Sequence, residues 1–168
     1  MKTTQILIAG FGGQGILFAG KFLAYKGLTE DLQVSWLPSY GPEMRGGTAN
    51  CNVIISDTPV GSPIITTPDV LVAMNLPSLD KYEGACTSGA KLIIDSTLIG
   101  RKVERDDVEV FYVPATELAN KNNTPKLAKK LEVSIATISR DVEFLRDRLN
   151  APIEYSFEKK GYYYTRKY

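Results

Sequence analysis

The sequence has no histidine and only two cysteines among its 168 residues. Without histidine, the commonest general base and the commonest zinc ligand are both missing. Cys51 and Cys86 are too few and too far apart for an iron–sulfur or zinc motif, and they are typical of reduced thiols in a cytosolic protein. No signal peptide and no apolar run of about 18 residues is present, so we expect a soluble cytoplasmic protein with no membrane partner.

The chain also lacks a strong excess of either charge, since it contains 20 basic and 19 acidic residues. This balance gives the whole chain no general affinity for a polyanion. The distribution is uneven, however. Residues 1–125 hold ten basic and thirteen acidic residues, whereas residues 126–168 hold ten and six. Such an asymmetry between halves indicates a basic C-terminal appendage to an ordinary domain.

The most informative stretch is a glycine cluster between two apolar runs. Residues 6–9 form a run of strand length, residues 16–24 have helical spacing, and the glycines between them follow the pattern G-x-G-x-x-G. The cluster contains Gly10, Gly12, Gly13, Gln14 and Gly15. In this pattern one glycine makes a turn, one allows the close approach of a ligand or backbone, and one, here Gly15, lets the helix pack on the strand. Either an anion binds at the helix N-terminus or the glycines serve packing alone, and spacing does not decide between these two interpretations.

The second strand argues against a nicotinamide cofactor. A domain that binds NAD needs an acidic residue at the end of this strand to hold the ribose hydroxyls. We expect the strand over residues 33–37, and Pro38 follows it. Glu30 and Asp31 precede the strand, at its wrong end, so we do not expect NAD to bind.

Four further strands are predicted, over residues 49–56, 69–75, 91–96 and 108–114, with helices over 78–86 and from 116. The alternation of strands and helices predicts an α/β fold: a Rossmann-like three-layer domain with a largely parallel sheet. Ligands and partners of such sheets gather at the carboxyl ends of the strands. Asp95 ends a strand there, and we interpret it as a cap of the following turn rather than a functional acid.

The loop over residues 40–48 is a second candidate site at the same edge. It contains Tyr40, Arg45, Gly46 and Gly47, together with one proline. An arginine beside glycines, whose backbone is not covered by side chains, is suited to bind a carboxylate or phosphate. Composition alone leaves open a surface turn with a solvated arginine.

Three ordered motifs resemble the gamma subunit of 2-oxoacid:ferredoxin (or flavodoxin) oxidoreductases, of the 2-oxoglutarate or 2-oxoisovalerate type. The motifs are the glycine cluster of residues 10–15, the Tyr-Gly-Pro-Glu-Met-Arg-Gly-Gly stretch of residues 40–47, and the run over residues 55–63. The resemblance covers residues 3–125, and we expect residues 1–125 to form this gamma-like domain.

The resemblance implies a subunit that docks on the alpha, beta and ferredoxin-like subunits of a complex. Such a complex decarboxylates a 2-oxoacid on thiamine diphosphate, forms an acyl-coenzyme A and reduces ferredoxin. The resemblance implies that thiamine diphosphate, magnesium, iron–sulfur clusters and coenzyme A act in the complex and that none is bound by this chain alone. It also implies that the glycine turn and the Arg45 loop shape a subunit interface and the coenzyme A side of the active site. It identifies no catalytic residue.

Residues 126–168 have a different pattern. A short helix over residues 127–131, a turn capped by Ser134 and a second helix from residue 135 to 145 form a helix-turn-helix pattern. The pattern of residues 152–157 and 161–165 predicts a two-stranded wing. This segment resembles the winged helix-turn-helix of YafY/DeoR-type regulators. The resemblance places Thr137, Ser139 and Arg140 against DNA bases and Lys159 and Lys160 against its backbone.

Two alternatives follow for the C-terminal module. In one, the chain is a ligand-sensing regulator whose tail binds DNA. In the other, residues 126–168 form a packing or oligomerisation tail, because a net charge of +4 is modest for a module that binds duplex DNA alone.

Overall fold

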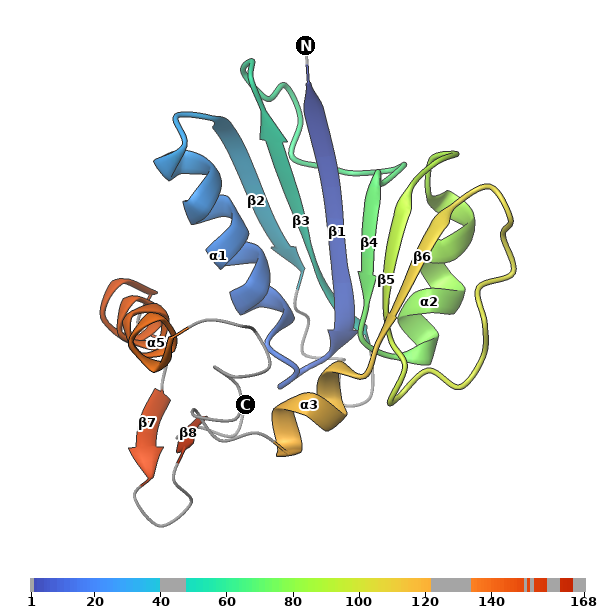
Figure 1. The fold of residues 1–168 in the computed structure, drawn as a ribbon. Helices are drawn as coiled ribbons and strands as arrows, with labels where there is room; N and C mark the ends of the chain where they lie inside the picture. The colour runs from blue at the N-terminus through green and yellow to red at the C-terminus, as the bar shows by residue number, and fades with distance from the viewer. Residues whose placement is uncertain are drawn as a thin grey trace. The chain divides into compact units, whose positions relative to one another are not determined.

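The structure is a computed structural model that describes residues 2–39, 48–121, 134–149, 151, 153–156 and 161–164 (Figure 1). The chain forms two compact units, residues 1–115 and residues 116–168. The division falls earlier than the boundary expected after residue 125, which lies outside the described residues.

The first unit is built around a six-stranded sheet in the order β2-β3-β1-β4-β5-β6. Its strands are β1 (Thr3–Phe11), β2 (Gln33–Ser39), β3 (Thr48–Ser56), β4 (Val70–Ala73), β5 (Lys91–Asp95) and β6 (Glu109–Val113). Its helices are α1 (Ile16–Thr29), α2 (Leu76–Tyr82) and the short 3-10 helix η1 (Glu83–Ala85). All six strands expected from the sequence are therefore present.

The sheet is mixed, which corrects the expectation of a largely parallel sheet. β1, β4, β5 and β6 pair in parallel, but β3 runs antiparallel to both of its neighbours, β1 and β2. The reason is the short link over residues 40–47 between β2 and β3. A parallel connection needs a crossover of roughly a dozen or more residues, so this link makes β2 and β3 a hairpin.

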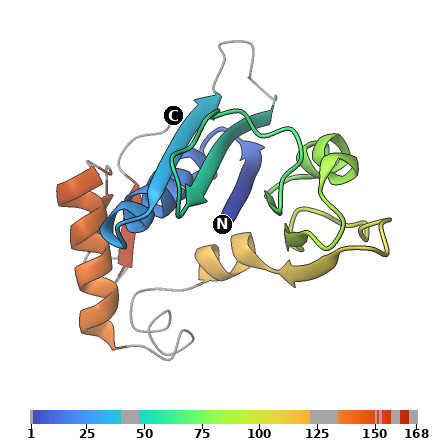
Figure 2. The same ribbon diagram turned by 90° about the horizontal axis from the view of Figure 1, so that it is seen from above.

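Helices cover both faces of the sheet, as the three-layer expectation required. On one face, α1 packs through Ile16 and Ala24 against Ile8 of β1 and Cys51 and Val53 of β3. On the other face, Leu79 of α2 belongs to a buried cluster that includes Leu7, Leu71, Ala73, Leu92 and Ile94. Figures 1 and 2 show that α1 lies beside β2 and β3, towards one end of the strand order, and that α2 lies beside β5 and β6, towards the other end.

Small residues on α1 determine how closely this helix approaches the sheet. Gly20, Ala24 and Gly27 are its buried positions beyond the first turn. A Cβ built on Gly20 would stand 2.3 Å from the Sγ atom of Cys51, and one built on Gly27 would stand 2.8 Å from a methyl group of Val34. The helix backbone therefore rests almost directly on β2 and β3.

The second unit holds the helix α5 (Ile135–Leu149) and the antiparallel pair β7 (Ile153–Ser156) and β8 (Gly161–Tyr164). Helix α3 (Ala115–Lys121) begins at the division between the units. The helix predicted from residue 135 and the predicted pair of strands are thus present. The helix predicted over residues 127–131 lies outside the described residues, so a winged helix-turn-helix stays a prediction.

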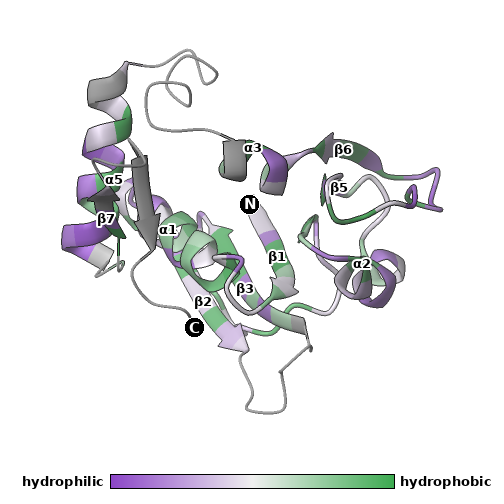
Figure 3. Cartoon of the chain, turned by 90° about the horizontal axis from the view of Figure 1, so that it is seen from below, coloured by the Kyte–Doolittle hydropathy of each residue, from purple (hydrophilic) through white to green (hydrophobic). Residues whose placement is uncertain are grey.

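Helix α5 is amphipathic. Ile138 is buried and Val142 and Leu145 are half-buried, whereas Arg140 and Asp141 are exposed. Figure 3 shows hydrophobic and hydrophilic residues along this helix. Among the described residues, no helix is long and apolar enough to cross a bilayer.

Candidate functional site

The order in which the chain adds strands to the sheet changes direction between β1 and β4. After β1 it passes through α1 on one face towards β2, and after β4 it passes through α2 on the other face to β5. In open α/β sheets, ligands bind outside the carboxyl ends of the strands at such a switch point. The segments that meet here are the glycine turn, residues 11–15, and the start of α2 at Met74 and Asn75.

The glycine turn needs glycine for two different reasons. Gly13 and Gly15 have φ angles of 90° and 77°, in the left-handed region that residues with a Cβ rarely adopt. Gly10 is required for space, because its Cβ would stand 2.6 Å from Gln14 Oε1 and 2.8 Å from Met74 Cβ. The turn therefore uses glycine both for its backbone conformation and for the space that a Cβ would fill, and a role in ligand binding stays a prediction.

The role expected of Gly15 is wrong in detail. A Cβ on Gly15 would meet nothing within 4 Å, so this residue does not mediate contact between helix and strand. Gly15 is the N-cap of α1, and its positive φ allows the chain to enter the helix. Gly20 and Gly27, further along α1, provide the close packing instead.

Gln14 ties the two sides of the switch point together. Its Oε1 accepts a hydrogen bond of 2.5 Å from the backbone N–H of Phe11, and its Nε2 donates one of 2.9 Å to the carbonyl oxygen of Met74. The amide thus joins the end of β1 to the end of β4. Both ends of this amide thus have protein partners, and we call this link between the two strand ends the Gln14 brace.

Sequence reasoning missed two polar side chains at the start of α2. Asn75 caps this helix, since its Oδ1 accepts a hydrogen bond of 2.9 Å from the N–H of Ser78. Within the part of the chain that the structure describes, Asn75 Nδ2 and Ser78 Oγ are buried without a hydrogen-bond partner. Buried polar groups are normally paired, so these two atoms are exceptions within the described part of the fold. The signal was the Asn-Leu-Pro-Ser sequence after an apolar run, which is typical of a helix start.

The Arg45 loop begins and ends at the same edge. Tyr40, Arg45, Gly46 and Gly47 lie outside the described residues, but Ser39 ends β2 and Thr48 begins β3. Thr48 pairs with Phe11, the last residue of β1 and the first of the glycine turn. The two stretches chosen from the sequence therefore start from neighbouring strands, as expected.

Acidic residues at the strand ends follow the sequence interpretation. Asp95 is 2% exposed, and its Oδ1 accepts a hydrogen bond of 3.0 Å from the N–H of Thr97, which confirms its role as a turn cap. Glu30 and Asp31 lie between α1 and β2, at the amino end of β2. They are thus at the opposite edge of the sheet from the glycine turn.

The two cysteines belong to opposite faces of the sheet. Cys51 packs with α1, and Cys86 lies in the cluster beside α2. Burial raises the pKa of each thiol to about 11. Two protonated thiols separated by the sheet do not fit as joint ligands of one metal cluster.

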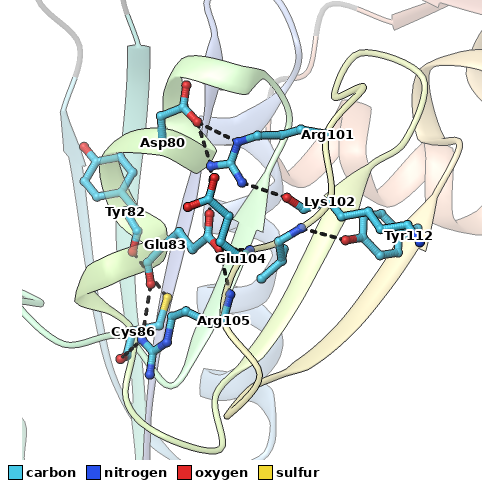
Figure 4. A network of polar contacts seen from close by, with 10 residues as sticks. Asp80, Tyr82, Glu83, Cys86, Arg101, Lys102, Glu104, Arg105 and Tyr112 are labelled. Atoms are coloured by element: carbon cyan, nitrogen blue, oxygen red, sulfur yellow. Dashed lines mark hydrogen bonds and ion pairs between the residues drawn. The ribbon is translucent and has the colours of Figure 1, made fainter.

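A network of ion pairs fixes the loop before β6 on α2 and η1 (Figure 4). The buried carboxylate of Glu83 accepts hydrogen bonds from Arg101 Nη2 at 2.7 Å and from the N–H groups of Glu104 and Arg105 at 2.5 and 3.3 Å. Asp80 also binds Arg101, and these contacts raise the pKa of its guanidinium further. The network serves as a structural clamp away from the glycine turn.

The candidate DNA-contacting residues lie partly on α5. Ser139 and Arg140 are on this helix, and Thr137 is in its first turn, where its N–H donates a hydrogen bond of 3.0 Å to Ser134 Oγ. Ser134 thus caps the helix as expected. Lys159 and Lys160 lie outside the described residues.

Comparison with known proteins gives consistent matches. Residues 5–165 match the family described as pyruvate ferredoxin/flavodoxin oxidoreductase. The ketoisovalerate oxidoreductase subunit VorA of Methanothermobacter thermautotrophicus is 44% identical over 131 residues, which cover 78% of this chain but 27% of that relative. The 2-oxoglutarate synthase subunit KorC of Methanocaldococcus jannaschii is 36% identical over 118 residues, covering 69% of this chain and 63% of the relative.

A solved structure has the same fold. The gamma subunit of a keto/oxoacid ferredoxin oxidoreductase from Geobacter sulfurreducens matches with a TM-score of 0.63 and 31% identity, over 72% of this chain and 66% of that one. The match of residues 5–165 runs on past residue 125, where the resemblance was expected to end. The family pattern therefore includes most of the C-terminal unit.

Proposed function

Because this chain belongs to the pyruvate ferredoxin/flavodoxin oxidoreductase family, we propose that it is the gamma subunit of a 2-oxoacid:ferredoxin oxidoreductase. The complex oxidatively decarboxylates a 2-oxoacid to acyl-coenzyme A and CO2 and reduces ferredoxin. The observation that carries the proposal is the agreement of two independent likenesses. The chain is 36% identical to a 2-oxoglutarate synthase subunit and shares the fold of a solved gamma subunit.

This chain contributes structure rather than redox chemistry to the complex. Cys51 and Cys86 are buried on opposite faces of the sheet, which does not suit a shared iron–sulfur cluster. Thiamine diphosphate, magnesium and the iron–sulfur clusters therefore belong to the alpha, beta and ferredoxin-like subunits, which are its partners in the cytoplasm. In this proposal the enzyme's active site is incomplete without those subunits.

Coenzyme A is the group that suits the switch point of this chain. It carries phosphates and amide carbonyls, which accept hydrogen bonds. Backbone N–H groups at Gly12, Gly13 and Gly15 are donors at the start of α1, and we propose that the Arg45 side chain joins them in binding this ligand.

The test is assembly followed by turnover. The tagged chain is co-expressed with the alpha and beta subunits from the same source, and the purified material is assayed for reduction of ferredoxin with each 2-oxoacid. Coenzyme A-dependent reduction that requires this chain supports the proposal. If the chain never co-purifies with those subunits, the proposal fails.

A second candidate function rests on α5 and the β7–β8 pair. An amphipathic helix with a capped start, followed by a two-stranded sheet, is compatible with a winged helix-turn-helix, although the family match extends through this region. In this alternative the chain is a ligand-sensing regulator, and Thr137, Ser139, Arg140, Lys159 and Lys160 contact DNA. A mobility shift with random duplex at low salt tests it, and no shift at micromolar protein excludes it.

A further inference from the structure

The Gln14 brace takes the place of one backbone hydrogen bond between β1 and β4. The N–H of Met74 donates a hydrogen bond of 2.8 Å to the carbonyl oxygen of Ala9. In a regular parallel ladder the next bond would run from the N–H of Phe11 to the carbonyl oxygen of Met74. Instead, the Gln14 amide is inserted between these two groups, at 2.5 Å from the first and 2.9 Å from the second. The two chains are thus joined through a side chain at the point where they separate.

Gly10 leaves the space that the inserted amide occupies. The pairing of β1 with β4, continued by one residue, places Gly10 opposite Met74. A Cβ on Gly10 would stand 2.6 Å from Gln14 Oε1 and 2.8 Å from Met74 Cβ. A side chain at position 10 would therefore push the amide out of place. Two members of the glycine cluster, at positions 10 and 14, are in this way matched to each other.

Gln14 also fixes the two ends of the glycine turn. Its backbone N–H donates a hydrogen bond of 3.3 Å to the carbonyl oxygen of Phe11, so that Phe11 and Gln14 are joined both through the backbone and through the side chain. Gly12 and Gly13 lie between them and are exposed. Among the residues that the structure describes, the N–H groups of Gly12, Gly13 and Gly15 have no acceptor. The position of these donors therefore depends on the residues that flank them.

We propose that Gln14 is a positioning residue for coenzyme A, and this inference rests on the proposed function. The brace holds the backbone donors of Gly12, Gly13 and Gly15 in one place, where they bind the diphosphate of coenzyme A at the N-terminus of α1. Gln14 acts through the backbone of the turn and not through contact with the ligand. Donors that are already ordered bind an anion more tightly than donors that must be ordered on binding.

The experiment uses the full chain assembled with its partner subunits. Gln14→Met has nearly the same length as glutamine and makes neither hydrogen bond of the brace. Gln14→Asn keeps an amide but is one methylene too short to join Phe11 to Met74. Calorimetric titration gives the Kd of coenzyme A, and ferredoxin reduction gives kcat and each KM. We expect both variants to raise the Kd and the KM of coenzyme A about tenfold, and to leave kcat and the KM of the 2-oxoacid unchanged.

Glu83→Gln is the matched control for a general loss of stability. It weakens a hydrogen-bond network that lies away from the glycine turn, around Arg101 and the N–H groups of Glu104 and Arg105. We expect its Kd for coenzyme A to equal that of wild type. A rise as large as that in the Gln14 variants would show that lower stability alone weakens binding, and it would overturn the inference.

NMR relaxation of the isolated full chain separates positioning from direct contact with the ligand. The backbone amide signals of Gly12 and Gly13 report fast motion of the turn. We expect greater motion at both glycines in the two Gln14 variants and no change in Glu83→Gln. Weaker binding of coenzyme A with unchanged motion at these glycines would mean that Gln14 touches the ligand, and it would overturn the inference.

The remaining outcomes keep this inference separate from the proposed function. If both Gln14 variants bind coenzyme A as tightly as wild type, the inference fails and the proposed function stands. If neither Gln14 variant folds while Glu83→Gln does, the brace serves the fold alone and the inference fails. If the wild-type chain never forms a complex with coenzyme A-dependent turnover, the proposed function fails and the inference fails with it.

Discussion

Gly20 of α1 and Cys51 of β3 are in such close contact that no other residue fits at position 20 without rearrangement. The Cβ of an alanine there would stand 2.3 Å from the Sγ atom, 3.1 Å from Trp36 Nε1 and 3.2 Å from a methyl group of Val53. Cys51 is fully buried, so its sulfur has little room to move aside. This contact, rather than the glycine turn, fixes the distance between α1 and the sheet.

We therefore expect Gly20→Ala to lower the free energy of unfolding by about 1–3 kcal/mol, the usual range for overpacking. Gly15→Ala should cost about 1–2 kcal/mol for a different reason, the left-handed backbone conformation. Urea denaturation of each single variant and of the double variants Gly20→Ala/Cys51→Ala and Gly15→Ala/Cys51→Ala, with Cys51→Ala as the reference, provides the test. The smaller residue at position 51 should rescue Gly20→Ala but should not rescue Gly15→Ala.

The brace formed by Gln14 can be tested with a nearly isosteric change. In Gln14→Glu the carboxylate still accepts from Phe11 N–H, but it faces the Met74 carbonyl without a hydrogen to donate. We expect a loss of stability of about 1–3 kcal/mol, because a hydrogen bond is replaced by two facing acceptors. Calorimetry measures this directly. Full stability in Gln14→Glu would mean that the brace does not hold the two strand ends together.

The two thiols should resist modification in the folded protein. Their pKa values of about 11 leave almost no thiolate at pH 8, and both side chains are buried. We expect slow labelling by a thiol reagent in buffer and rapid labelling of both thiols in denaturant. Rapid labelling of the native chain at pH 8 would contradict this.

The same pKa values give a dependence of stability on pH. Because the pKa of each folded thiol is raised above its ordinary value of 9, the stabilising effect is complete below pH 9 and is lost as the pH rises towards 11. The melting temperature should therefore fall between pH 9 and 11. The fall should be smaller in Cys51→Ala/Cys86→Ala when each protein is compared with itself at pH 8.

We expect the hydrogen-bond network around Glu83 to contribute more to the free energy of unfolding than the exposed ion pair between Arg105 and Asp107. Glu83→Gln removes the charge that Arg101 and two backbone N–H groups contact, and we expect a loss of about 1–3 kcal/mol. Asp107→Asn is the matched control. The pKa of Asp107 is lowered to about 2 by its hydrogen bond to Arg105, but the pair is exposed to solvent, so the change in stability should be small. Equal effects in a denaturant titration would contradict this ranking.

Arg45 should affect the assembled enzyme rather than the isolated chain. We expect Arg45→Ala to leave the melting temperature nearly unchanged and to reduce the activity of the reconstituted complex. Arg45→Lys should restore activity only in part, because lysine cannot make the two parallel hydrogen bonds of a guanidinium group. Activity equal to wild type in Arg45→Ala would mean that this side chain is solvated.

The sequence was sufficient for features that depend on neighbouring residues. The strand, turn and helix around Gly10–Gly15, the cap role of Asp95 and the presence of the six strands follow from local apolar runs and turn residues. Contacts between distant segments did not follow in the same way. The packing of Gly20 depends on Cys51, and the role of Gln14 depends on Met74. A pattern of neighbouring residues therefore cannot predict either contact.

The direction of β3 is an intermediate case. The strands expected from the sequence left a link over residues 38–48, which is close to the roughly dozen residues that a parallel crossover needs. The alternation of strands and helices elsewhere suggested a largely parallel sheet. In the structure the two strands extend to Ser39 and from Thr48, and the link of residues 40–47 that remains makes them a hairpin.

That hairpin has a consequence for how the family can diversify. Ser39 and Thr48, which flank the link, are both held in the sheet, and Thr48 is paired with Phe11. Insertions between them leave the strand register unchanged, and the entropy cost of a longer loop grows only slowly with its length. Residues can therefore be added between these two positions without disturbing the strands that hold them.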